Sequence, residues 1–295
     1  MGAATRMIGR RTAPGRGPVA AAAGLVVLST LSASVAAAVS VSLFAAMPAG
    51  TVSSSRLVIA AVLMLMVWRP RLGRRPAGEW IAIGGFGIAM AGISICLHEA
   101  ITRIPIGVAI TLEFLGPCAV ALLASRRLHE AACSLFALVG VVLVAGPGGG
   151  FDTVGFAFAL AAAAFLGLYT VFAEKVGKSP GGMGDLSLSV AVAAVLSLPF
   201  AHGGLGTMTA RTFGLLLLTA TLGVLVPYLA DTVAARLSGA RVIGTLFSLD
   251  PIMGTLVGIV ALGQAINSAG IMGIALVVLA GSALVWTSPK SPTHA

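Results

Sequence analysis

Three carboxyl residues lie inside long apolar runs of this chain, although only nine of its 295 residues are Asp or Glu. They are Glu113, Asp231 and Asp250. An ionisable side chain at the centre of a bilayer costs about 2.5–3.5 kcal/mol on insertion scales, so each of these residues needs a reason to be there. A carboxyl group in such a place can carry a proton or bind an ammonium group, and the pattern indicates one of these two roles.

Depth along the helix favours Glu113 and Asp250 for that chemistry. Glu113 follows Pro105, expected at the outer surface, and at 1.5 Å per residue it lies about 12 Å deep. Asp250 follows Arg241, expected at the inner surface, and lies about 13 Å deep by the same reasoning. We predict substrate or proton sites at both. The alternatives are a structural hydrogen bond for Glu113 and stabilisation of a helix break for Asp250.

Four more polar residues are candidates for substrate or proton binding. Asp231 and Tyr228 lie nearly on one helix face, and snorkelling to the interface is the alternative for Asp231. His98 could face a cavity and change its charge near neutral pH, or it could be a hydrogen-bonded packing residue. Arg56 could meet a substrate carboxylate or reach lipid headgroups.

Three prolines fall within apolar runs, at Pro117, Pro227 and Pro251. A proline in a spanning helix frees a backbone carbonyl, which is tolerated where the helix faces protein or a wet cavity. We therefore expect helix breaks beside the carboxyl residues.

The elements that position these residues are membrane helices. The chain is 58% hydrophobic and 9% charged, whereas soluble domains are roughly 25% charged. A spanning helix needs about 20 apolar residues, and the sequence predicts an all-α polytopic membrane protein with ten of them. The expected spans are 19–44, 52–68, 80–101, 105–124, 131–147, 154–173, 186–201, 212–233, 240–262 and 268–287.

The basic residues indicate orientation rather than nucleic-acid binding, despite a net charge of +9. With the N-terminus inside, 15 of the 18 Lys and Arg fall in inner segments, and only Arg103 and Arg211 fall in outer ones. This bias predicts a multi-pass protein of the cytoplasmic (inner) membrane with both termini cytoplasmic. No metal-ligand, nucleotide-binding or nucleophile motif occurs in the sequence, so we expect no enzyme activity, no cofactor and no metal.

An internal repeat divides the chain. TLEFLGPCAVALL starts at Thr111 and TLFSLDPIMGTLV starts at Thr245, 134 residues later. The predicted parts are a basic tail (1–18), two five-helix repeats (19–148 and 154–287) and a C-terminal tail (288–295). Because five is odd, the second repeat must enter the membrane inverted, and such repeats place a substrate site between them near the midplane.

The stretches IPIGVAITLEFLGPCAVALLASRR from Ile104, VPYLADTVAARL from Val226 and GTLFSLDPIMGTLVGIVALGQ from Gly244 resemble the threonine/homoserine exporter branch of the EamA family, in the drug/metabolite transporter superfamily. The resemblance implies a central cavity, export of small amino acids and coupling to protons. By position it implies cavity roles for the following residues: Glu113, Tyr228, Asp231, Asp250, His98 and Tyr169. The chain departs from the family pattern at Ser34, His98, Leu166 and Gln264, of which Ser34 and Leu166 are expected to line the cavity.

The sequence thus predicts a proton-coupled secondary transporter that exports a small polar metabolite, with an amino acid such as threonine or homoserine as the first candidate. Its expected partners are that substrate, protons and the lipid bilayer, and the sequence is compatible with a monomer. An exporter of a drug, an aromatic or a purine-type metabolite is the alternative, because Leu166 leaves more room than the Trp usual there. A non-transport membrane sensor is the second alternative.

Overall fold

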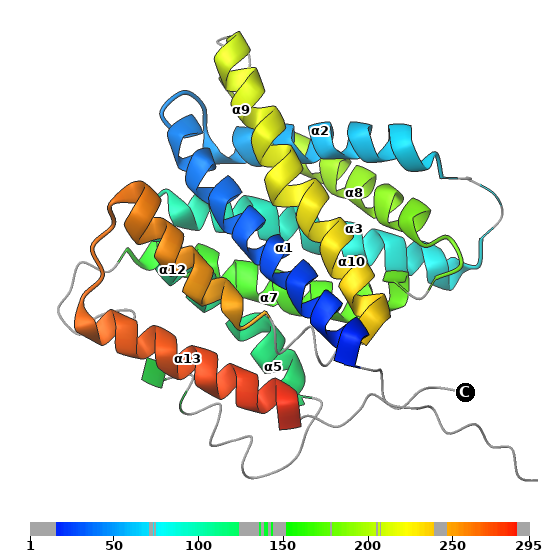
Figure 1. Cartoon of the computed structure of the whole chain (residues 1–295). Coiled ribbons are helices and arrows are strands. Elements are labelled where there is room, and N and C mark those ends of the chain that lie inside the picture. Colours follow the sequence, from blue (N-terminus) through cyan, green and yellow to red (C-terminus); the bar gives the residue numbers. More distant parts are fainter. Residues whose placement is uncertain are drawn as a thin grey trace, which may run out of the picture.

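The computed structural model describes residues 16–70, 73, 75–123, 136, 139–140, 143, 152–177, 179–204, 206, 208–238 and 247–287. Every regular element in these ranges is helical, and Figure 1 shows how the helices pack. They are α1 (Arg16–Leu43), α2 (Ala49–Trp68), α3 (Ala77–Ile101), α4 (Ile106–Glu113), α5 (Leu115–Leu123), α7 (Thr153–Gly177), α8 (Met183–Ser197), η1 (Leu198–Phe200), α9 (Ala210–Ala220), η3 (Thr221–Leu225), α10 (Val226–Ser238), α12 (Leu249–Leu262) and α13 (Ser268–Thr287).

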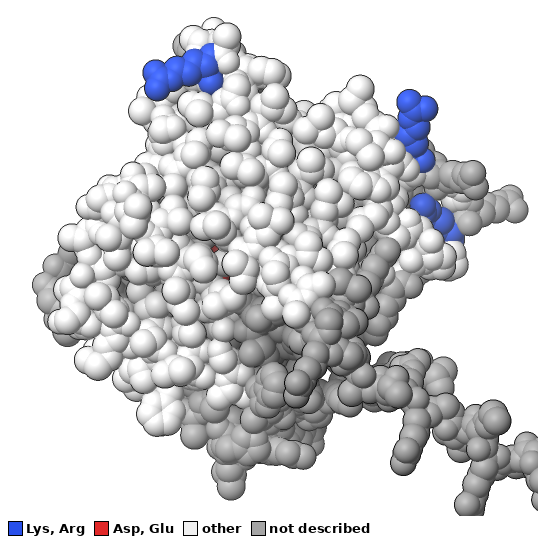
Figure 2. Space-filling view, viewed as in Figure 1, with Lys and Arg blue, Asp and Glu red and all other residues white. Residues whose placement is uncertain are grey.

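Six helical stretches are long and apolar enough to cross a membrane. Each is 18–25 residues long, which matches the length that a hydrocarbon core about 30 Å thick requires. Large apolar side chains also point outward: Met66, Ile81, Val195 and Leu279 are 65–68% exposed. Figure 2 shows basic atoms only toward the margins of one face, and the surface between them consists almost entirely of uncharged residues. The chain is therefore a multi-pass membrane protein, with its apolar surface against lipid.

The helices fall on the expected spans wherever the structure describes them, with ends that differ by a few residues. The fifth span, 131–147, and the start of the ninth, 240–246, lie largely outside the described residues. The count of ten therefore stays a prediction. Two spans are interrupted, and in both cases the interruption lies just before a proline at which the sequence predicted a helix break.

The first interruption separates α4 from α5 at Phe114. Pro117 has no N–H to donate to the carbonyl of Glu113, four residues before it, and its ring crowds that carbonyl. The backbone N–H of Phe114 still donates to the carbonyl of Ile110 at 3.1 Å. The break therefore leaves Glu113 as the last residue of α4.

The second interruption is the π-helical segment η3, between α9 and α10. The three elements form one long rod in Figure 1. The N–H of Val226 donates to the carbonyl of Thr221, five residues back. Pro227 explains the wider turn, because its ring would clash with the carbonyl of Gly223 in a regular α-helix.

Glycines allow several helices to approach closely. A Cβ at Gly85 or Gly92 of α3 would meet the rings of Phe172 and Phe165 of α7. Lipid offers no hydrophobic drive for helix association, so such close van der Waals packing has to hold the helices together.

The same kind of contact joins α4 to α12, the helices that carry the two copies of the repeated motif. Gly107 of α4 lies against Thr255 of α12, and Gly254 of α12 lies against Ile110 of α4. The side-chain oxygen of Gln264 accepts a 3.1 Å hydrogen bond from the N–H of Ile106, at the first residue of α4. The motif-bearing helices of the two repeats are thus packed on each other.

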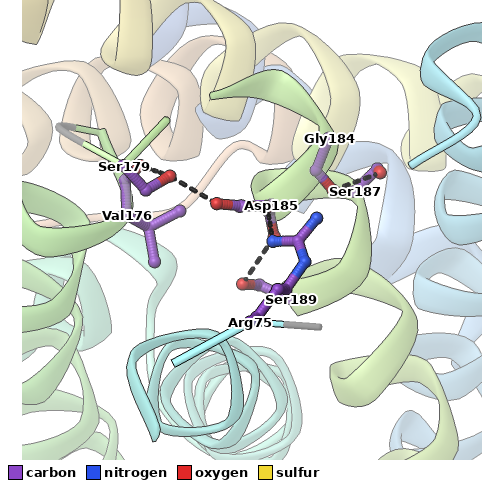
Figure 3. Close-up of polar contacts among 7 residues, drawn as sticks. All are labelled: Arg75, Val176, Ser179, Gly184, Asp185, Ser187 and Ser189. Atoms are coloured by element: carbon purple, nitrogen blue, oxygen red, sulfur yellow. Dashed lines mark hydrogen bonds and ion pairs between the residues drawn. The ribbon is translucent and has the colours of Figure 1, made fainter. Parts of the chain in front are cut away.

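Loops expected on one side of the membrane meet at one end of the molecule. At the expected inner end, Arg75 pairs with Asp185 at the start of α8, and Ser179 donates a hydrogen bond to the same carboxylate (Figure 3). At the expected outer end, Arg103 pairs with Asp152 at 3.9 Å. These contacts fit the predicted alternation of loops between the two sides.

Candidate functional site

The seven residues predicted for substrate or proton binding lie in one connected group, which we call the central polar cluster. Its members come from six helices: Arg56 (α2), His98 (α3), Glu113 (α4), Tyr169 (α7), Tyr228 and Asp231 (α10), and Asp250 (α12). Arg56, His98, Glu113 and Tyr169 are each at most 7% exposed. Tyr228, Asp231 and Asp250 are partly buried, so residues up to 194 positions apart in the chain contribute to one largely covered site.

Glu113, Asp231 and Asp250 form the acidic side of the cluster. Asp250 is an electrostatic neighbour of both Glu113 and Asp231. Two carboxyl groups that share a buried site repel each other when both are charged, so a proton or a cation has to accompany them. This is the arrangement that proton exchange or ammonium binding requires.

Two hydroxyl groups of α1 complete the acidic side. Thr30 Oγ1 donates to Asp250 Oδ1 at 2.6 Å, and Ser29 of the same helix lies beside Asp231. Asp250 also lies in the first turn of α12, where the positive end of the helix dipole favours a negative charge. A negative charge on Asp250 is therefore stabilised both by a hydrogen-bond donor and by the helix dipole.

Asp231 keeps one oxygen without a partner. Its Oδ1 atom is buried and has no hydrogen bond with any described residue. An interfacial Asp that snorkels would have both oxygens in water, so the structure does not support that alternative. A buried acceptor left unpaired costs about 1–3 kcal/mol, which makes this oxygen a place for a ligand or a proton.

An aromatic wall borders the carboxyl groups. The rings of Tyr169 and Tyr228 have centroids 5.9 Å apart, and the ring centroid of Phe86 lies 4.7 Å from that of Tyr169. Leu166 packs into the same apolar cluster, one turn before Tyr169. The expected lining position of Leu166 is thus adjacent to the tyrosines.

Arg56 forms the basic side of the cluster. Its Nε donates to the carbonyl of Thr219 at 3.3 Å, and its Nη1 donates to Ser40 Oγ at 3.4 Å and contacts His98 Nε2. The side chain is 4% exposed. In this structure it does not extend to lipid headgroups, which was one of the two alternatives for this residue.

His98 is held as a neutral ring. Its Nε2 faces the guanidinium of Arg56, which can only donate, so this nitrogen must accept. Its Nδ1 therefore carries the proton, which it donates to the carbonyl of Ser94 at 2.6 Å. Ser53 Oγ lies 2.9 Å from the same nitrogen. His98 orients Arg56 in this arrangement, and a second proton on the ring would place two donors against each other.

Sequence reasoning missed the hydroxyl groups that serve these charged residues: Ser29, Thr30, Ser40 and Ser53. The run of Ser and Thr at positions 29, 30, 32 and 34 was the available signal, and only Ser34 was singled out from it. Ser34 is buried one turn after Thr30, so the two lie on the same face of α1.

Two cavities accompany the site without including its residues. One of about 160 Å³ lies at the expected inner end, beside Glu79, Lys175 and Asp185. The other, of about 470 Å³, is an apolar groove between α5 and α7. In Figure 2 acidic atoms appear only as small areas deep between other atoms near the centre of this face. The central polar cluster is thus largely covered by protein in this conformation.

The described residues hold no group of three or more His, Cys, Asp or Glu side chains arranged for a metal ion. The cysteines Cys96 and Cys118 are free thiols.

Comparisons with known proteins relate the chain to a transporter family. Residues 153–287 match the EamA-like transporter family, over the range expected for the second repeat. The threonine/homoserine exporter RhtA of Escherichia coli (strain K12) is 26% identical over 273 residues, which are 90% of this chain and 92% of that protein. RhtA of Salmonella typhimurium (strain LT2) is 24% identical over 91% of this chain and 92% of its own length.

Two further matches are more distant or shorter. An uncharacterized transporter of Clostridium kluyveri is 28% identical over 168 residues, or 53% of each chain. A crystal structure aligns with a TM-score of 0.62 and 20% identity, covering 90% of this chain and 96% of the other. At that identity the likeness establishes the shared fold alone.

Proposed function

We propose that this chain, which carries an EamA-like transporter domain over residues 153–287, is a secondary carrier that exports a small polar metabolite in exchange for protons. An amino acid such as threonine or homoserine is the first candidate substrate, by analogy with the names of its relatives. We take the chain to be a carrier and not an enzyme.

One observation carries this proposal: α4 and α12, the helices that bear the repeated motif, pack on each other, and buried Glu113 of α4 is an electrostatic neighbour of the partly buried Asp250 of α12. In a carrier whose two halves open alternately, a site between the repeats is reached from either side in turn. A carboxyl pair at that place can take up a proton from one side and release it to the other.

Exchange follows if a substrate ammonium competes with the proton for the same carboxyl group. Glu113 is our first choice for that group, because Asp250 already accepts a hydrogen bond from Thr30. The break between α4 and α5 places Glu113 at the end of α4. A small movement at this break can change the side of the membrane that the carboxyl group faces. Tyr169, Tyr228 and Asp231 would complete the substrate site.

The proposed architecture is ten spanning helices in two inverted five-helix repeats, 19–148 and 154–287. We place the chain in the cytoplasmic membrane with both termini cytoplasmic, on the basis of the Lys and Arg distribution. The ion pairs Arg75–Asp185 and Arg103–Asp152 support this arrangement, since each joins loops expected on the same side.

Efflux from loaded proteoliposomes tests the function. We expect export of threonine or homoserine that accelerates when a pH gradient is imposed, and no such acceleration in Glu113→Gln. A panel of other amino acids tests the substrate class. Efflux that ignores the pH gradient in the unmodified protein would reject proton coupling, and absence of efflux for every amino acid would reject the substrate class.

An exporter of an aromatic or drug-like metabolite is the second candidate. Its support is the contact of Leu166 with a cluster that contains Phe86, Tyr169 and Tyr228, because these side chains offer a large apolar surface. Efflux of an aromatic amine or a purine from the same liposomes distinguishes the two candidates, because the second predicts export of these compounds.

A further inference from the structure

Arg56 is a buried cation that lacks an anionic partner among the described residues. Arg75 and Arg103 pair with Asp185 and Asp152, whereas none of the described carboxyl groups pairs with Arg56. Its hydrogen-bond acceptors are a carbonyl, a hydroxyl and an imidazole, all of them neutral. Removing a charge from water costs several kcal/mol unless an opposite charge compensates it, so this guanidinium is prepared to receive an anion.

The site around Arg56 is built from three separate elements. The carbonyl of Thr219 lies at the end of α9, directly before the π-helical segment, and holds Nε. Gly223 within that segment lies so close to the guanidinium that a Cβ there would collide with it. His98, fixed by the carbonyl of Ser94, holds Nη1 from the opposite helix. The widened turn and the missing side chain together make room for the guanidinium.

The acidic side of the same cluster has an acceptor that lacks a hydrogen-bond donor. Asp231 Oδ1 is a buried acceptor with no partner in the described part of the chain. Tyr228 links the two sides, since it is an electrostatic neighbour of Arg56, Glu113 and Asp231. One side therefore lacks an anion and the other lacks a donor.

We infer that Arg56 binds the carboxylate of the substrate and that the acidic side binds its ammonium group, so that the site selects a zwitterion. This inference rests on the proposed function and adds the substrate class to it: α-amino acids with both groups free, as opposed to amines, esters or acylated derivatives. Arg56 is the residue that determines this selectivity, and His98 and Gly223 position it.

The test is equilibrium binding to the purified full-length protein in detergent, with four probes. L-Threonine and L-homoserine carry both groups, 1-amino-2-propanol lacks the carboxylate, and N-acetyl-L-threonine lacks the ammonium group. We expect the unmodified protein to bind the two amino acids at least tenfold more tightly than either incomplete analogue. Deleting one charge-assisted hydrogen bond in a desolvated site typically weakens binding by about that factor or more.

Three variants with matched controls locate the effect. Arg56→Gln is expected to lose the preference for threonine over 1-amino-2-propanol, and Arg56→Lys to restore part of it. Gly223→Ala keeps the charge but displaces the guanidinium, and should reduce the same preference. The controls are Arg211→Gln, an exposed arginine of α9, and Gly214→Ala, a substitution in α9 whose added methyl group would have no neighbour within 4 Å.

The outcomes separate this inference from the proposed function. If the unmodified protein binds threonine and 1-amino-2-propanol equally, or if Arg56→Gln keeps the preference, the inference is wrong while amino-acid export still stands. If it binds neither these two nor any other amino acid of the efflux panel, both are wrong. A preference that falls in Arg56→Gln and Gly223→Ala, but not in the two controls, supports the inference.

Discussion

Thr30 of α1 donates a 2.6 Å hydrogen bond to the carboxylate of Asp250 in α12, across 220 residues of sequence. The bond joins the first helix of the first repeat to the helix that carries the second copy of the motif. It therefore couples the position of α1 to the state of a carboxyl group in the central polar cluster.

Removing this hydroxyl group is expected to destabilise the site. A hydrogen bond to a charged group contributes about 1.5–3 kcal/mol, so Thr30→Val should lower the thermal unfolding midpoint and slow efflux, and Thr30→Ser should recover both. Ser42→Ala is the control on the same helix, since Ser42 donates only to a carbonyl of α1 itself. Equal effects of Thr30→Val and Ser42→Ala would contradict a special role for the bond.

Glu113→Gln tests the coupling role of the carboxyl group. The substitution keeps the shape of the side chain but removes its ability to exchange a proton. We expect normal insertion, loss of net export and loss of the response to an imposed pH gradient. Asp250→Asn should show a milder form of the same defect. Unchanged pH-driven efflux from liposomes containing the Glu113→Gln protein would transfer the coupling role to Asp231 or Asp250.

Leu166→Trp should narrow the range of exported substrates. Leu166 packs with the apolar cluster around Tyr169, and a larger ring there fills space beside the tyrosines. Efflux competition with small and bulky substrates measures the change. His98→Ala should alter transport without reducing the amount of inserted protein, because the ring positions Arg56. If neither variant changes transport of any substrate, these residues do not line the cavity.

Breaking the Arg75–Asp185 pair should destabilise the protein more than replacing both members. Asp185 is fully buried and accepts a hydrogen bond from Ser179 as well (Figure 3). Truncating one partner of a buried pair costs about 3–5 kcal/mol, because the other charge stays buried. Thermal unfolding of Arg75→Gln, Asp185→Asn and the double variant gives the coupling, and additive effects of the single variants would argue against a coupled pair.

Topology reporters test the orientation. A reporter fused after Lys290 should lie in the cytoplasm, and one inserted between Gly146 and Asp152 should lie outside. The contact between Arg103 and Asp152 places the last residue of this segment beside another loop expected outside. Reporters on the same side of the membrane would reject the assignment of ten spans with cytoplasmic termini.

The sequence predicted the charged members of the site because charge inside an apolar run is a strong signal. Glu113, Asp231 and Asp250 are conspicuous by their cost in a bilayer. Thr30 and Ser53 are not, because Ser and Thr occur throughout these helices and commonly bond to a carbonyl of their own helix. Their role depends on which helix lies opposite, and one chain's apolar pattern does not specify that.

The positions of the helices were predictable from the apolar runs, whereas the geometry within a run was not. Apolar length predicts where a helix runs, so the described helices lie close to the expected spans. It does not reveal the kind of change in helical geometry within an apolar run, such as the interruption at Phe114 or the π-helical segment η3. Pro117 and Pro227 indicated where breaks would occur, whereas the kind of break depends on local packing. The contact of Arg56 with the segment beside Pro227 followed from neither signal.

The π-helical segment also determines the rotational phase of everything that follows it in the rod. It accommodates one residue more than an α-helical turn would, and an α-helix advances about 100° per residue. Converting Thr221–Leu225 to a regular α-helix without changing its length would rotate α10 by about that angle relative to α9, turning Tyr228 and Asp231 away from α1. The hydropathy of the rod would hardly change. Two chains with indistinguishable apolar profiles could therefore present different helix faces to the same site.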